Sequence, residues 1–477
     1  MRGDFDMGSS SESPPSLYHE SLNANLTGVR RDGGVWQFRG LQYASIPHRF
    51  ASPKLTTVRT GDVDCTLYGS CCPQNHVDFR HLLRIPDDEF VPELRQDEFT
   101  CLNLDVTMPE PSSERLPVLF WIHDKPIIIV TVNYRLNIFA FGDETSDPNL
   151  ALKDQRAALE YVRLHIAGFG GDPKNITIAG ESAGAMYSHA HAAMGAPVRQ
   201  CILQSGTMYL SPPQPPEATS ALRKRLSITL LSLGGYDLRT APASHLLEAQ
   251  AKMGLMSYYI QMEPKLEGWQ QKWGNVERIA IGDNEHESAI WKIGIDALEP
   301  STICSAFDLA GSCEKAKLLK RVYGIVPGRA ISCKLGALDF LNDVRFTLPT
   351  GLVIEQSRRA RRPVFGFLID QPNPWQSSSR AHHGVDLLYL FRGFNFPDQS
   401  AWKVSEEMQR KWIEFISGED PWQEGRFYAF GPFGRCEEVN VADRRRYRHL
   451  DAVLEAGPQN IEAVFKAIAA GRTSLLS

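Results

Sequence analysis

The chain has 477 residues, with 51 Lys and Arg against 56 Asp and Glu, a formal net charge of −5 and 43% hydrophobic residues. This composition can bury a large core and excludes a disordered, collagen-like or coiled-coil protein. The near balance of charge gives no reason to expect nucleic acid as a partner. The longest strongly apolar runs, Leu116–Ile122 and Pro126–Val132, have seven residues each. About 20 are needed to span a bilayer, so we expect no membrane span.

The N-terminal segment 1–16 is rich in Ser, Pro and Gly, and it lacks an apolar run followed by a small-residue cleavage site. We therefore expect a disordered tail over 1–16 and no secretory signal. This favours a cytoplasmic protein, or a secreted one if the true start lies upstream of Met1. The nine cysteines are too few for a disulfide scaffold, and no two of them have C-x-x-C spacing. We expect no metal site.

Short apolar runs alternate with a helical pattern in the first half of the chain. Asn25–Tyr43 alternates apolar and polar residues about Gly33-Gly34, which predicts a β-hairpin. Runs rich in β-branched residues predict strands at 102–108, 116–122, 127–134 and 176–179. Leu150–His165 has helical periodicity. Strands that alternate with helices indicate a parallel sheet, and the unbroken apolar run 126–132 predicts a central strand buried on both faces.

The pattern changes after Leu210, where the segment 210–220 carries four prolines in eleven residues. Helical periodicity over 217–233 and 243–256 predicts a helical insertion at about 211–275. Beyond it we predict a strand over 362–369 and a helix over 404–416. The arginine-rich clusters 358–362 and 444–448 are interpreted as solvated faces. Residues 17–477 are expected to form one α/β domain that contains this insertion.

The segment 175–184 reads NITIAGESAG, an apolar strand that runs into G-x-S-x-G, and the residues that follow can form a helix. This is the context of a nucleophile elbow. The glycines are needed because the turn strains the serine backbone and brings strand and helix too close for a Cβ atom. Ser182 is the candidate nucleophile. The Ala183 N–H, at the positive end of the helix dipole, is a candidate donor to an oxyanion.

The flanking residues extend this motif. They are GGDPKNITIAGESAG (170–184), LALKDQ (150–155), VTVNYR (130–135), FRGLQYA (38–44), CPQ (72–74), CLNLDV (101–106) and QSG (204–206). Together they resemble the type-B carboxylesterase and cholinesterase-like lipase family, over residues 25–210 with one interruption and more patchily beyond. The resemblance implies an α/β-hydrolase fold, with a mostly parallel central sheet flanked by helices. It also implies a serine carboxylesterase that acts on small-molecule esters without a cofactor; the oligomeric state is left open.

A serine nucleophile needs a base and a carboxylate that orients the base, and α/β-hydrolases place them after the serine in the order acid, then His. GDNEHES (282–288) resembles the acid loop of the family, with Glu287 at the acid position. Glu285 and Asp283 are the alternatives. The resemblance implies acyl transfer, in which Ser182 attacks the ester carbonyl and Glu287 holds the base in place.

The base is expected in HHGVDL (382–387), which resembles the family's base motif. His383 takes the position of the base that moves the proton, and His382 is the alternative. The other histidines near the site motifs are interpreted as packing residues; they are His189, His191 and His286.

Cys72 and Cys101 match a pair that forms a disulfide in secreted members of the family. Because no secretory signal is visible, we expect this bond only under oxidising conditions.

The chain departs from the family after the run Leu116–His123. In relatives this strand leads into a Gly-Gly-Gly loop that supplies most of the oxyanion hole, then into a helix and the next strand; here Asp124-Lys125-Pro126 follow directly. About 30 residues are absent, although parallel neighbours need a crossover of about a dozen or more. We therefore expect that one strand leaves its place, that the run 116–134 is rearranged, or that this sequence is a truncated gene product.

Loss of the loop also affects the expected chemistry. Removal of one oxyanion donor costs about 10²–10³ in turnover. We therefore expect this chain to hydrolyse esters poorly or to fold badly, and a catalytically inactive binding scaffold is the alternative function.

Overall fold

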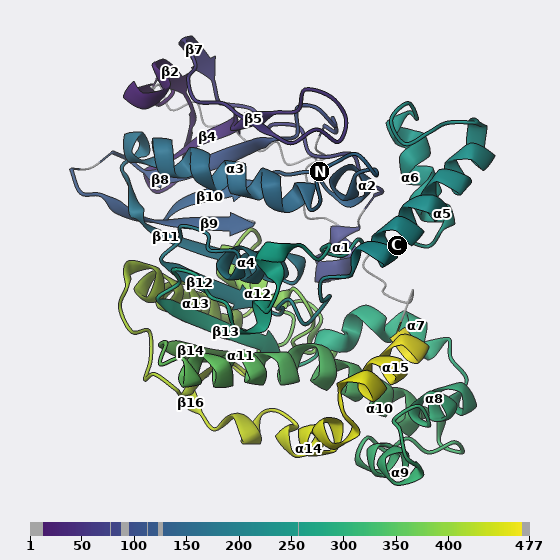
Figure 1. Ribbon diagram of the computed structural model, residues 1–477. Coiled ribbons are helices and arrows are strands. Elements are labelled where there is room, and N and C mark those ends of the chain that lie inside the picture. The colour runs from purple at the N-terminus through teal and green to yellow at the C-terminus, as the bar shows by residue number, and fades with distance from the viewer. Residues whose placement is uncertain are drawn as a thin grey trace, which may run out of the picture.

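The computed structural model describes residues 13–76, 78–86, 95–111, 113–122, 127–255 and 257–469. Most of the expected tail 1–16 lies outside these residues, and its last residue, Ser16, begins strand β1 (Ser16–His19). The central feature is an 11-stranded sheet in the order β16-β15-β14-β13-β12-β11-β9-β10-β8-β4-β3 (Figure 1). The strands from β15 to β10 in this order pair in parallel, and antiparallel strands complete both edges. The predicted mostly parallel sheet is confirmed.

The strands of the large sheet have these bounds: β3 Val29–Arg31, β4 Val35–Gln42, β8 Asn103–Pro109, β9 Leu116–Ile122, β10 Ile128–Val132, β11 Gly171–Glu181, β12 Gln200–Gln204, β13 Arg278–Asn284, β14 Val364–Ile369, β15 Phe427–Phe430 and β16 Cys436–Val439. Two small sheets lie outside it, formed by β1, β2 (Ala24–Thr27) and β7 (Gly61–Asp64), and by β5 (Ala44–Ser45) and β6 (Lys54–Leu55). The predicted hairpin therefore begins at Val29 rather than Asn25, because β2 pairs with β1 and β7 instead of β4.

The helices have these bounds: α1 Phe79–Leu83, α2 Asn137–Phe141, α3 Leu150–His165, α4 Ala183–Ala193, α5 Pro216–Gly234, α6 Ala243–Lys252, α7 Lys292–Asp296, α8 Pro300–Phe307, α9 Cys313–Val322, α10 Ala330–Asn342, α11 Leu348–Arg359, α12 Val385–Phe391, α13 Gln399–Ser417, α14 Tyr447–Ala456 and α15 Pro458–Ala469. A π-helical turn, Asp343–Thr347, joins α10 to α11. Helix α3 has the predicted bounds, and α5 and α6 lie in the predicted insertion between β12 and β13. Among the described helices, none is long and apolar enough to cross a membrane.

Alternate residues of the central strands face two different cores. On β9, Val118 and Phe120 pack into a core with α3, α4 and α11, whereas Leu119 and Trp121 pack against α12 and α13. All four side chains are at most 2% exposed. Helices cover both faces of the sheet (Figure 1), which explains why its strands read as unbroken apolar runs. A third core lies among α7–α10, α14 and α15.

Strands β9 and β10 are parallel neighbours in spite of their short connection. Val118 pairs with Ile128, and β9 also pairs with β11 on its other side. The expectations that a strand leaves its place or that the run rearranges are therefore wrong for the described residues. Both strands are buried, so expelling either one would expose a large apolar area. Only residues 123–127 connect the two strands, and 123–126 lie outside the described part. The expectation that this sequence is a truncated gene product stays a prediction.

The second arginine cluster is not a solvated face throughout. Arg445 is buried, and its Nε lies 2.8 Å from Asp283 Oδ1 while its Nη1 lies 2.7 Å from Asp370 Oδ1. Asp283 belongs to β13 and Asp370 follows β14, so this group of three charges ties the segment before α14 to two central strands. Arg448, in the same cluster, is exposed as predicted.

We expect Arg445→Met to lower the free energy of unfolding by about 3–5 kcal/mol, because it leaves Asp283 and Asp370 buried without their cation. Arg448→Met is the matched control, since an exposed arginine in the same cluster should change stability by no more than about 0.5 kcal/mol. Thermal unfolding followed by circular dichroism measures both. Equal midpoints for the two variants would contradict the structural role of Arg445.

Candidate active site

Ser182 lies in the sharp turn between β11 and α4. Its φ of 55° and ψ of −116° are unfavourable for a residue with a side chain, so the backbone is strained as the elbow motif predicts. A Cβ atom on Gly180 would lie 2.3 Å from the carbonyl carbon of Gly184. The absence of a side chain on Gly180 therefore permits a close approach of strand and helix.

Ser182, Glu287 and His383 come from three separate loops and meet at one edge of the sheet. His383 Nε2 lies 2.8 Å from Ser182 Oγ, and His383 Nδ1 lies 2.5 Å from Glu287 Oε2. Both Glu287 and His383 are buried. With the proton on Nδ1, the imidazole donates to the carboxylate and accepts from the serine hydroxyl. A hydroxyl, an imidazole and a carboxylate thus stand in series.

The alternative acids lie away from the imidazole. Asp283 contacts Arg445 and accepts a hydrogen bond from the Thr347 hydroxyl at 2.9 Å. Glu285 accepts from Arg380 at 2.7 Å. Burial would raise the pKa of Glu285, but Arg380, together with Arg445 and His286, outweighs burial and lowers that pKa.

The alternative base is also engaged elsewhere. His382 Nδ1 lies 2.8 Å from the His383 carbonyl, and its Nε2 lies 3.0 Å from Asn373 Nδ2. Burial lowers the pKa of His382 to about 4.

The other three histidines lie away from Ser182. His189 stacks on Trp273 with ring centroids 4.5 Å apart. His191 lies 2.8 Å from Gln155 Oε1, and His286 is half-buried with its pKa lowered to about 4 by burial.

Two further carboxyl groups, neither of them predicted from the sequence, surround His383. Glu181 Oε1 lies 3.3 Å from His383 Nε2, and burial raises the pKa of Glu181 to about 8. Asp386 is buried nearby. Burial alone would lower the pKa of His383, but Glu181, Glu287 and Asp386 together raise it to about 9. Both residues stand in the site motifs, as the Glu of GESAG and the Asp of HGVD, which is the signal that could have identified them.

Asn284, the last residue of β13, links the acid loop to the base loop. Its backbone N–H donates to Glu287 Oε1 at 2.6 Å, and its side chain donates to the His382 carbonyl at 3.0 Å and to Asp386 at 3.2 Å. Gln204 donates to the other Asp386 oxygen at 2.6 Å. These donors satisfy buried acceptors, and the Asn284 N–H holds Glu287 in a defined position.

Ala183 is the first residue of α4. The N–H groups in the first turn of a helix have no acceptor within the helix, and the helix dipole makes this end favourable for an anion. The geometry therefore leaves the Ala183 N–H able to donate beside Ser182. The family's further oxyanion donors follow the strand that corresponds to β9, and here residues 123–126 lie outside the described part.

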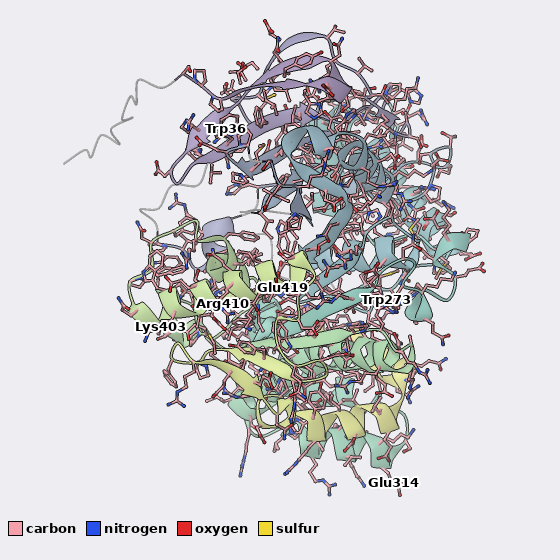
Figure 2. The ribbon with its side chains drawn as sticks, turned by 90° about the vertical axis from the view of Figure 1, so that its left-hand side faces the viewer. Trp36, Trp273, Glu314, Lys403, Arg410 and Glu419 are labelled. Carbon is pink, nitrogen blue, oxygen red and sulfur yellow. The ribbon has the colours of Figure 1, made fainter. Side chains whose placement is uncertain are left out.

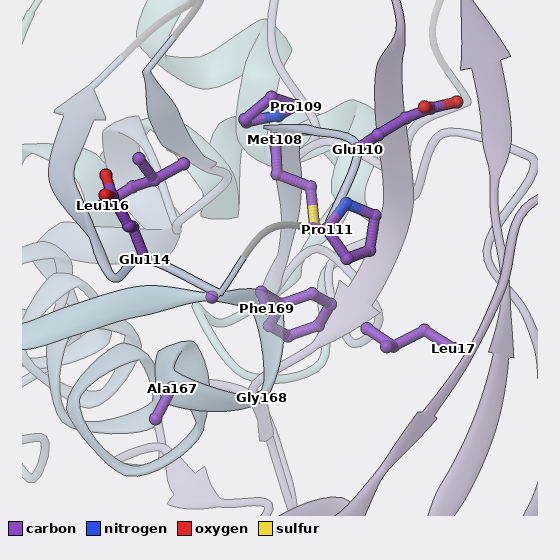
Figure 3. Close-up of a pocket in the computed structure, with 11 residues that line it drawn as sticks. Leu17, Met108, Pro109, Glu110, Pro111, Glu114, Leu116, Ala167, Gly168 and Phe169 are labelled. Carbon is purple, nitrogen blue, oxygen red and sulfur yellow. The ribbon is translucent and has the colours of Figure 1, made fainter.

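A cavity of about 210 Å³ lies elsewhere in the molecule (Figure 3). Its lining includes Leu116, the first residue of β9, and Gly170, which precedes β11. These are the amino ends of parallel strands, whereas Ser182 follows the carboxyl end of β11. The cavity is therefore at the opposite edge of the sheet and plays no part in the site.

Comparison with known proteins agrees with the fold and the motifs. The carboxylesterase family model matches residues 22–125 and 124–274, in two segments that meet at the short connection after β9. The chain is 29% identical to Lipase 3 of Yarrowia lipolytica over 483 residues, 90% of this chain and 94% of that protein. It is 35% identical to para-nitrobenzyl esterase of Bacillus subtilis over 447 residues, 82% of this chain and 88% of that one. A solved PNB esterase structure has the same fold, with a TM-score of 0.73 and 22% identity, covering 94% of this chain and 100% of that one. The chain therefore belongs to the carboxylesterase family of ester hydrolases, with the α/β-hydrolase fold.

Proposed function

We propose that Ser182 is the nucleophile of this ester hydrolase, with His383 as its base and Glu287 as the acid that orients the base. The observation that carries the proposal is the unbroken hydrogen-bonded series from Ser182 Oγ through both nitrogens of His383 to Glu287. It stands at a strained strand-to-helix turn, the geometry that exposes a nucleophile.

The reaction follows from this series. His383 Nε2 removes the hydroxyl proton as Ser182 Oγ attacks the ester carbonyl, and the same nitrogen returns the proton to the departing alcohol. Water then attacks the acyl-enzyme, again with His383 as the base. Glu287 keeps the proton on Nδ1, so that Nε2 remains the acceptor, and it stabilises the imidazolium that forms in each half of the reaction.

We propose further that this chain catalyses the reaction slowly. Charge develops on the carbonyl oxygen in the transition state, and donors aimed at that oxygen contribute a large part of the rate. The Ala183 N–H is one such donor, but the sequence passes from His123 to Asp124 without the Gly-Gly-Gly loop that supplies the others in the family. The side chains of Ser182, His383 and Glu287 are all present and aligned, so the expected loss of rate is confined to stabilisation of the oxyanion.

The absent loop favours a second candidate function, a catalytically inactive scaffold that binds a partner. Against it stands the hydrogen-bonded series at Ser182, since a binding scaffold has no use for a nucleophile with an aligned base. Among substrates, the relatives named as lipases favour long acyl chains, and the para-nitrobenzyl esterase favours an aromatic alcohol part. A comparison of p-nitrophenyl acetate with p-nitrophenyl palmitate tests short against long acyl chains on the same aromatic group.

We expect the purified chain to hydrolyse p-nitrophenyl acetate at least about 10²-fold more slowly than the Bacillus subtilis esterase assayed beside it, because oxyanion donors are missing. Insertion of that esterase's Gly-rich segment between His123 and Asp124 should raise the rate by about 10²-fold or more, and Ser182→Ala should abolish it. The measurement is the release of p-nitrophenol under steady-state conditions.

The control is an insertion of the same length in which prolines replace the glycines, because proline has no N–H to donate. Fast turnover of the unaltered chain that requires Ser182 would refute the proposed deficit. Absence of Ser182-dependent turnover with the Gly-rich insertion would favour the scaffold instead.

Activity should also depend on pH through His383, which accepts a proton only when neutral. The surrounding carboxyl groups raise the pKa of His383 to about 9. The reactivity of Ser182 should therefore be low at pH values below about 9 and should increase as the pH rises through that value. Glu181→Gln removes a carboxyl group 3.3 Å from Nε2, so it should lower this pKa and shift the profile to lower pH. The rate at which a fluorophosphonate labels Ser182, followed from about pH 6 to about pH 10, reports the profile.

Glu285→Gln is the matched control, since Glu285 contacts Arg380 rather than the imidazole. The same profile for Glu181→Gln and Glu285→Gln would show that Glu181 does not act on His383.

A further inference from the structure

Two buried cysteines lie in contact in the third core, away from the proposed nucleophile. Cys304 on α8 and Cys333 on α10 place their Sγ atoms 3.8 Å apart. Cys304 is 6% exposed and Cys333 is fully buried. At 3.8 Å two sulfur atoms touch without a bond, and a disulfide requires about 2.05 Å. Bond formation therefore requires the two sulfur atoms to approach by about 1.75 Å.

The pair differs from the one that the family resemblance implies. All nine cysteines are free thiols, including Cys72 and Cys101. Cys304 and Cys333 are 29 positions apart in the chain, so a bond between them would close a loop of substantial size. Closing such a loop restricts the unfolded chain and stabilises the folded one.

We propose that Cys304 and Cys333 form a disulfide when the protein meets a disulfide oxidant such as glutathione disulfide. The Cys304 thiol, the more accessible of the two, loses its proton and attacks the oxidant, which releases one glutathione thiol and leaves a mixed disulfide. The Cys333 thiol then loses its proton and attacks the Cys304 sulfur, which releases the second glutathione thiol. The two cysteines are thereby oxidised by two electrons, and one glutathione disulfide is reduced to two thiols.

The rate of this exchange should be low. Burial, together with the adjacent Cys304, raises the pKa of Cys333 to about 11. The Cys333 thiolate, which attacks in the second step, is therefore scarce at neutral pH. The bond is expected to form during folding in an oxidising buffer, or over hours in the folded protein as α8 and α10 open locally.

The bond would brace helices that support the site. Asn342, at the end of α10, accepts a hydrogen bond from the Ser288 N–H at 3.3 Å, next to Glu287. Phe346, in the π-helical turn that follows α10, packs against the His383 ring with centroids 5.4 Å apart. A link from α8 to α10 thus restrains the element that contacts both the acid loop and the base. The formation of the bond itself does not depend on the proposed function.

The test is a peptide map of the full chain after equilibration in glutathione buffers, both as folded protein and during refolding from the reduced, unfolded chain. Free thiols are alkylated before digestion with trypsin under non-reducing conditions. Cys304 lies in peptide 293–315, which also contains Cys313, and Cys333 lies in peptide 330–334. Cys313 is exposed, and its neighbour Glu314 lies at the outer edge of the molecule (Figure 2). The experiment is therefore made with Cys313→Ser, so that a link between the two peptides identifies Cys304.

We expect tryptic peptides 293–315 and 330–334 to be linked in the Cys313→Ser protein. Adding Cys304→Ser to this protein should abolish the link, whereas adding Cys201→Ser should leave it intact. Cys201 is the matched control because it is a fully buried cysteine on a different element, β12. In a Cys72→Ser background, where the Cys72–Cys101 bond cannot form, the oxidised protein should unfold at a midpoint about 4 °C higher than the reduced protein, and adding Cys333→Ala should remove this difference. Because each variant is compared with itself in two redox states, a loss of stability caused by the substitution does not affect the result.

Free thiols at positions 304 and 333 under both oxidation procedures would overturn the proposal. So would a link that joins Cys333 to Cys313 in the unsubstituted chain and disappears in Cys313→Ser.

Discussion

The parallel register of β11 to β14 is the constraint on which the proposed site depends. One row of paired residues crosses these four strands, from Glu181 through Gln204 and Gly282 to Phe367. Because parallel strands end at the same edge of a sheet, the loops that follow this row meet one another. Glu287 and His383 are 96 positions apart in the chain, and His383 and Ser182 are 201 apart. A register shift in any one of these strands would separate the three side chains.

The same edge of the sheet carries several buried carboxyl groups, and a carboxylate shielded from water needs a partner. Asn284 and Gln204 supply amide donors to Asp386, and Trp412 orients Gln204 through a 2.9 Å hydrogen bond to its carbonyl oxygen. Arg445 neutralises Asp283 on β13 and Asp370, which follows β14. Glu287 and Asp386 are thus met by neutral amides rather than cations, which leaves their negative potential to act on the imidazole.

The sequence predicted what depends on local pattern and missed what depends on distant contacts. Helix α3 and strand β9 have the predicted bounds, because apolar periodicity encodes them directly. The burial of Arg445 was missed, because its partner Asp283 is 162 positions away. The third core was missed for the same reason, as it joins α8 and α10 to α15. The expected displacement of β9 or β10 was wrong because both strands bury apolar side chains in the sheet, and this burial keeps them paired in spite of the short connection.

The short connection after β9 also shows that the fold and the proposed chemistry depend on different atoms. Strands β9 and β10 are held by apolar side chains such as Phe120 and Val130, which are fully buried, and by their backbone ladders with β11 and β8. None of these interactions requires the Gly-rich loop. In the proposed mechanism, by contrast, the oxyanion needs backbone N–H donors, and the family's Gly-rich loop is absent from this sequence. Loss of that loop would then remove transition-state stabilisation while it leaves both the sheet and the aligned side chains of Ser182, His383 and Glu287 in place.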